Sequence, residues 1–167
     1  VNNRMEDFNI KSPSFSQDYN LNYSGGNDKG HYYAGLGYNK SEGNAIGNYN
    51  RRLSFLLNVD YKIKSWLTTI SKFNFSTTKY KGISPFTGEE NYFSRNFSYP
   101  PTFRAYNNNG EMILGKNSGD GNQQFLADAW DNDENRQKFM FSQDFKIKPF
   151  EDLTINFKGD WFYEFYN

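Results

Sequence analysis

Cysteine is absent from this 167-residue chain, and histidine occurs only once, at position 31. Without cysteine the chain can form neither a disulfide framework nor a thiolate metal site. A single histidine leaves almost no material for a zinc site or for a histidine-based catalytic triad. The sequence therefore predicts a protein with no metal, no cofactor and no enzymatic activity.

The chain also lacks an excess of charge and any long hydrophobic run. Lysine and arginine together number 19, as do aspartate and glutamate, so the formal net charge at pH 7 is zero. A balanced charge gives no electrostatic reason to expect a nucleic-acid partner. The longest uninterrupted apolar run is three residues, which is too short for a transmembrane helix or for the apolar core of a signal peptide.

Aromatic residues and asparagine are abundant instead. The chain has 17 Phe, 13 Tyr and 3 Trp, together with 23 Asn but only five Ala. Aromatic side chains favour strands and asparagine favours turns, whereas asparagine competes with a helix for backbone hydrogen bonds. This composition predicts an all-β protein.

Hydrophobicity alternates with a period of two residues in six stretches. Every odd position from 53 to 63 is apolar, for example, while most even positions between them are polar. Such alternation is typical of a strand with one apolar and one polar face. The predicted strands are 15–23, 32–38, 53–63, 67–75, 139–147 and 153–165.

The connections between these strands alternate in length. Residues 27–29, 62–65 and 148–152 form three short connections, whereas 39–51 and 79–137 form two long ones. If the strands follow one another in a meander, all short turns lie at one end of the strands and both long loops lie at the other end. Outer-membrane β-barrels have this asymmetry, and their strands need about 9–11 residues to cross the membrane. The alternative is a soluble carbohydrate-binding β-sandwich, in whose strands hydrophobicity also alternates.

Several segments resemble one family of membrane proteins. Residues 24–38, which begin Ser-Gly-Gly-Asn-Asp, resemble a barrel hairpin of the SusC/RagA-like TonB-dependent outer-membrane transporters. Residues 41–44, 49–53 and 58–62 continue the likeness. The Tyr-Pro-Pro at 99–101, together with 106–110, resembles a long extracellular segment of that family, and 149–154 resembles its periplasmic turns.

The resemblance implies an antiparallel meander of about six strands from a larger barrel of about 22. Residues 1–167 would then be a partial barrel without the plug domain, and we expect the chain to be a piece of a longer polypeptide. The expected location is the outer membrane of a Gram-negative bacterium, with lipid around the barrel. The expected function is import of oligosaccharides or peptides. The expected partners are a SusD-like surface lipoprotein and TonB, the latter acting through parts of the parent chain outside this one. A siderophore- or cobalamin-type receptor barrel is the alternative within the same class.

Candidate site residues come from the long loop at 79–137, where nine aromatic residues occur between 86 and 130. We expect Tyr92, Tyr99, Arg104 and Trp130 to face the substrate or the lipoprotein lid, because loops of this length are often functional. Residues 122–130 are expected to form a short helix. The acidic residues Asp128, Asp131, Asp133 and Glu134 are interpreted as a solvated loop rather than a calcium site.

Two glycines also stand out within the second predicted strand. Gly35 and Gly37 are expected to lie on the face opposite Tyr32, Leu36 and Tyr38. Small residues on an inner barrel face leave room for something in the lumen, or they relieve curvature of the sheet. The sequence alone leaves both interpretations open.

Overall fold

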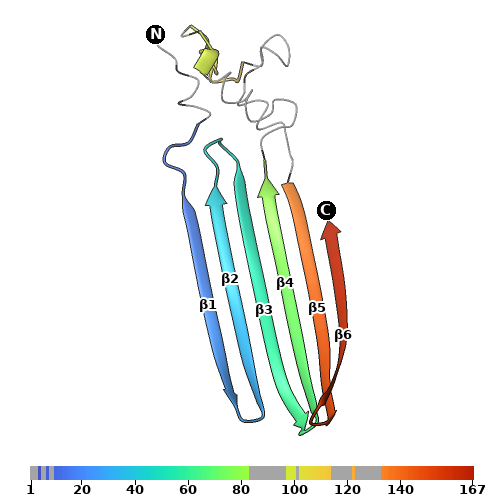
Figure 1. Cartoon of the computed structure of the whole chain (residues 1–167). Helices are drawn as coiled ribbons and strands as arrows, with labels where there is room; N and C mark the ends of the chain where they lie inside the picture. The colour runs from blue at the N-terminus through green and yellow to red at the C-terminus, as the bar shows by residue number, and fades with distance from the viewer. Residues whose placement is uncertain are drawn as a thin grey trace. The chain divides into compact units, whose positions relative to one another are not determined.

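The computed structural model describes residues 4, 7, 10–82, 97–100, 102–113, 122 and 133–167. Its six strands form one antiparallel sheet in which each strand pairs with its neighbours in sequence, from β1 in blue to β6 in red (Figure 1). The predicted all-β meander is therefore confirmed. The strands are β1 (Ser16–Asn27), β2 (Gly30–Glu42), β3 (Tyr49–Lys64), β4 (Leu67–Lys81), β5 (Asp133–Phe150) and β6 (Leu153–Tyr166).

Each strand is longer than its alternating stretch. β5 runs for 18 residues, although alternation is clear only over 139–147. The predicted connection 39–51 contracts to residues 43–48, so this loop is much shorter than expected. The physical reason is that ladder hydrogen bonds join backbone groups, and these pair whether or not the side chains alternate.

Three two-residue turns close the hairpins at one end of the strands. They lie at 28–29, 65–66 and 151–152. In the first turn the Asn27 side-chain oxygen accepts a hydrogen bond of 2.9 Å from the Lys29 backbone N–H, as asparagine commonly does in turns. The turn prediction is confirmed in position. Gly25 and Gly26 lie inside β1, before this turn.

The pairing of β5 with β6 shows how the two faces of the sheet are separated. Phe139 pairs with Tyr163, and Phe145 pairs with Phe157. Since odd residues pair with odd ones, their side chains share one face. The register shifts between Ile147 and Phe150, where Pro149 cannot donate to the ladder.

Aromatic rings continue this apolar face across four strands. The ring of Phe73 on β4 lies 5.7 Å from Phe55 on β3 and 5.0 Å from Phe139 on β5, measured between centroids. Phe139 in turn lies 5.0 Å from Trp161 on β6. Edge-to-face packing of this kind is a favourable geometry for aromatic pairs. The apolar face comprises Tyr19, Leu21, Tyr23, Tyr32, Leu36, Tyr38, Leu53, Phe55, Phe73, Phe139, Phe141, Phe145, Phe157 and Trp161.

No hydrophobic core covers this face within the described part of the chain. The two buried hydrophobic residues there, Ala45 and Ala105, both lie outside the strands. Phe157 and Trp161 remain 60% exposed. A sandwich would bury this face beneath a second sheet, so the single layer does not support the sandwich alternative.

The chain divides into two compact units. The first, which we call the sheet unit, consists of Gln17–Lys40, Arg51–Lys79 and Glu134–Asn167. The second, the loop unit, consists of Val1–Ser16, Ser41–Asn50 and Tyr80–Asp133. Within the loop unit, Ile10 pairs with Ala45 and Tyr106 pairs with Met112 in isolated antiparallel bridges.

Candidate functional site

The polar face of the sheet unit, opposite the apolar face, is built from amides, hydroxyls and charges. On β1 and β2, the Tyr33 hydroxyl donates a hydrogen bond of 2.8 Å to Asn22 Oδ1. The Asn39 side-chain amide donates to Asp18 Oδ2 at 3.2 Å. These bonds tie the two strands together through their side chains as well as their backbones.

Gly35 and Gly37 lie on this polar face, as predicted. A Cβ atom at Gly37 would lie 2.7 Å from Ser54 Oγ and 3.0 Å from Asn20 Oδ1. A Cβ at Gly35 would lie 3.1 Å from Asn22 Oδ1. The two glycines thus leave space among polar side chains of β1 and β3.

A shallow hollow of about 230 Å³ occupies that space. Its walls come from β1, β2, β3 and β4, so four strands in correct register are needed to form it. The polar groups that line it belong to Asn20, Asn22, Tyr33, Arg52, Ser54 and Asn74. We call this feature the glycine hollow.

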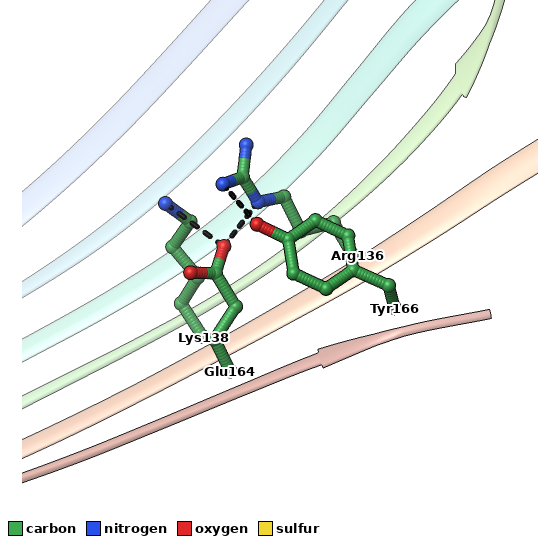
Figure 2. A network of polar contacts seen from close by, with 4 residues as sticks. All are labelled: Arg136, Lys138, Glu164 and Tyr166. Atoms are coloured by element: carbon green, nitrogen blue, oxygen red, sulfur yellow. Dashed lines mark hydrogen bonds and ion pairs between the residues drawn. The ribbon is translucent and has the colours of Figure 1, made fainter.

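A second polar cluster joins β5 to β6 on the same face. Figure 2 shows the Glu164 carboxylate between Arg136 and Lys138, with Tyr166 beside Arg136. Arg136 Nε donates to Glu164 Oε1, and Lys138 Nζ lies 3.1 Å from the same oxygen. The Arg136 guanidinium also lies over the Tyr166 ring, 4.7 Å from its centroid. The Glu164 side chain is only 17% exposed, so its charge is well enclosed by these partners.

A polar patch interrupts the apolar face at Gln143. The Gln143 amide nitrogen donates to Thr69 Oγ1, and its oxygen accepts from the Ser71 hydroxyl at 2.7 Å. These side chains therefore satisfy one another across β4 and β5. The patch explains why the alternation is weak over 67–75.

The described part of the loop unit contains two of the predicted site residues. The Tyr99 ring lies 4.6 Å from the Phe103 ring, at an interplanar angle of 32°. Arg104 Nη1 donates a hydrogen bond of 2.9 Å to Asn108 Oδ1. The structure thus places Tyr99 and Arg104 in one short segment, whereas Tyr92 and Trp130 lie outside the described residues.

Beside this segment, Asn107 organises a tight turn. Its side-chain oxygen accepts backbone hydrogen bonds of 2.9 Å from Asn109 and Glu111, and its amide donates to Glu111 Oε2 at 2.7 Å. Gly110 adopts a φ of 80°, which a glycine tolerates readily. The turn is therefore held together by hydrogen bonds among its own residues.

Fully buried Asn122 anchors the segment next to that turn. Its amide donates to the Ala105 carbonyl at 3.0 Å, and Ala105 is itself buried. The remainder of the expected 122–130 helix lies outside the described residues. So do Asp128 and Asp131 of the acidic cluster, while Asp133 accepts a hydrogen bond of 2.9 Å from the Tyr49 hydroxyl.

The described residues contain no candidate metal site. No group of three or more histidine or acidic side chains there could hold a metal ion. Among the same residues, no helix has the length and apolar character required to cross a membrane.

Comparison with solved structures gives a consistent likeness. The chain matches the RagAB peptide importer in its closed-closed state with a TM-score of 0.74 and 16% identity, covering 96% of this chain and 18% of that one. It matches another structure of the RagAB peptide transporter with a TM-score of 0.74 and 17% identity, covering 94% and 18%. The importer's open-open state gives a TM-score of 0.67 and 18% identity, covering 88% and 17%.

At these identities the likeness establishes the fold, and this chain spans less than a fifth of the matched chains. No protein-family model matches the sequence, and no curated protein matches it significantly. The six-stranded sheet thus has the architecture of one section of a much longer chain.

Proposed function

We propose that this chain is part of the β-barrel of a SusC/RagA-like, TonB-dependent transporter in the outer membrane of a Gram-negative bacterium. The observation that carries the proposal is the single-layered sheet with one exposed apolar face and one polar face. In a membrane, the apolar face would contact lipid and the polar face would line the lumen. The likeness to the RagAB importer supports the same arrangement.

The proposed cargo is a peptide or an oligosaccharide. The RagAB structures are described as those of a peptide importer, which supports the peptide. The sequence resemblance to SusC-like proteins supports the oligosaccharide. On this proposal a SusD-like lipoprotein covers the barrel, TonB supplies energy, and no bond of the cargo is made or broken.

We place contacts with the lipoprotein or the cargo on the long loop between β4 and β5. Tyr99 and Arg104 are the described candidates, and Tyr92 and Trp130 are proposed with them. Aromatic and arginine side chains often dominate interface energetics, which makes these four the first positions to substitute.

The test is removal of the gene that encodes this chain. The deletion strain should lose uptake of labelled peptides or of labelled oligosaccharides, and the intact gene should restore it. The protein should be recovered in the outer-membrane fraction together with a lipoprotein. Retained uptake of both cargoes with loss of an iron–siderophore complex or of cobalamin would instead favour the receptor alternative.

A further inference from the structure

We propose that the glycine hollow binds a carboxylate of the transported solute. This inference rests on the transport function proposed above, since it assigns the polar face to the lumen. It concerns the hollow alone and requires none of the loop residues.

The shape of the hollow depends on two missing side chains. Gly35 and Gly37 leave open the space that Cβ atoms would fill beside Asn22, Asn20 and Ser54. The glycine hollow, with a volume of about 230 Å³, has room for a small polar group rather than for a whole chain segment. The hollow is therefore suited to one functional group of a larger solute.

The charge of the hollow is positive. Arg52 is the one lysine or arginine that lines it, and no aspartate or glutamate does. Within the described part of the chain, the Arg52 guanidinium has no hydrogen-bond or ion-pair partner. Arg136 on β5 has its charge offset by Glu164, so Arg52 differs from the other arginine described on this face.

The four strands that form the hollow carry two acidic side chains on their polar face, and both have partners. Asp18 accepts hydrogen bonds from Asn20 and Asn39. Asp60 lies 3.4 Å from His31 Nδ1. The carboxylate that would complement Arg52 is therefore missing from its surroundings in the described sheet.

Further donors stand beside Arg52. Asn74 is half-buried, and its side-chain amide has no partner among the described residues. The Ser54 hydroxyl makes only a long hydrogen bond of 3.4 Å, to the Gly37 carbonyl. A carboxylate accepts several hydrogen bonds at once, and a planar guanidinium can bind it through two parallel ones. A guanidinium with an amide and a hydroxyl is thus a donor set that fits a carboxylate.

That carboxylate could belong to an acidic peptide or to a uronic-acid oligosaccharide, so the experiment needs one matched pair of each. The peptides are a C-terminally amidated hexapeptide with one central glutamate and the same peptide with glutamine. The oligosaccharides are a trigalacturonate and its methyl ester. Calorimetry on the intact purified transporter measures the affinity for all four.

The acidic member of one pair should bind about tenfold or more tightly than its neutral partner, because hydrogen bonds to charged groups are the stronger kind. Arg52→Gln should abolish that preference. Lys64→Gln removes a cation from the same strand outside the hollow, and it should leave the preference intact. Gly35→Ala should weaken binding of the acidic solute by placing a methyl group in the hollow, whereas Gly159→Ala, which meets open space, should not.

Other results would overturn the inference. A charge preference that persists in Arg52→Gln would place the carboxylate site elsewhere. A lower melting temperature of Arg52→Gln with unchanged affinities would mean that Arg52 pairs with another part of the transporter. Equal binding of acidic and neutral solutes would contradict this inference but not the transport function, whereas no binding of any solute would contradict both.

Discussion

At the scale of single residues, Gly30 has the least room for a side chain among the glycines that the structure describes. A Cβ atom there would lie 2.4 Å from the Asp60 carbonyl oxygen and 3.1 Å from Tyr61 Cα. Both obstacles are backbone atoms of β3, which cannot swing away as the end of a side chain could. Gly30 therefore permits the close approach of β2 to β3 beside the first hairpin turn.

We expect Gly30→Ala to destabilise the protein by about 1–3 kcal/mol, the usual cost of forcing extra atoms into a packed site. Gly159→Ala is the matched control, because its Cβ would meet no atom within 4 Å. Urea unfolding of the two variants in detergent or lipid checks the difference. Equal midpoints would show that the strands separate at little cost.

The two faces of β6 should respond differently to a buried charge. Phe157 lies on the apolar face and Asn156 on the polar face, one residue apart. Phe157→Arg should cost about 2–4 kcal/mol if the side chain meets lipid near the midplane, and Asn156→Arg should cost much less. Unfolding from lipid vesicles measures both, and similar costs would reject the assignment of faces.

At the scale of elements, the pairing of β5 with β6 combines backbone hydrogen bonds with an ion cluster. Arg136 and Lys138 face the same Glu164 oxygen, so this carboxylate holds two like charges side by side (Figure 2). The backbone groups of Asn135 and Asn167 continue the ladder beyond the cluster, at 2.8 and 3.0 Å. The cluster therefore lies within a paired region rather than at a frayed end.

Glu164→Gln should lower the melting temperature, because Arg136 and Lys138 would then repel one another without a counter-charge. The loss should become smaller as salt is raised, since ions screen partly exposed charges. Asp152→Asn removes a carboxylate from the β5–β6 turn and should change little. A salt-independent loss would indicate that packing of the side chain, not its charge, is responsible.

The turn around Asn107 should depend on one side chain. Asn107→Ala removes an acceptor for two backbone N–H groups and a donor to Glu111, so residues 105–113 should become easier to cleave in limited proteolysis. Asn108→Ala removes only the partner of Arg104 and should leave the turn resistant. Assembly of the sheet should be unchanged in both, because strand pairing does not depend on a loop tip.

Most of the strand arrangement could be predicted from the sequence, because alternation reports directly which side chains share a face. Strand ends could not, since β5 continues to Asp133 through residues that do not alternate. The polar patch at Gln143 was also missed. A polar residue at an apolar position looks like a broken pattern until the hydroxyls of the neighbouring strand are placed beside it.

The site was predicted less completely than the strands. Gly35 and Gly37 signalled open space on one face, but the glycine hollow needs Arg52 and Asn74 from two other strands. Their positions depend on register, which a sequence pattern does not specify between strands. Arg51 and Arg52 are adjacent in sequence, and alternation turns them to opposite faces of β3.

At the scale of the whole molecule, the exposed apolar face should govern behaviour in solution. Because burial of apolar surface is the main stabilising contribution in water, a single layer lacks most of that contribution. We expect the 167-residue chain to aggregate without detergent and to keep a β-sheet circular dichroism spectrum in micelles. A soluble monomer that unfolds cooperatively in water would contradict the proposed membrane location.

The three two-residue turns have a consequence for how such a sheet could grow. Each turn joins two neighbouring strands, so a hairpin begins and ends at the same end of the sheet. Both of its strands carry side chains on the apolar face and on the polar face. Duplication of a whole hairpin within the gene would widen the sheet while every existing turn stayed at the same end of the strands. Insertion of a single strand would carry all later turns across to the opposite side, so this architecture favours evolution in pairs of strands.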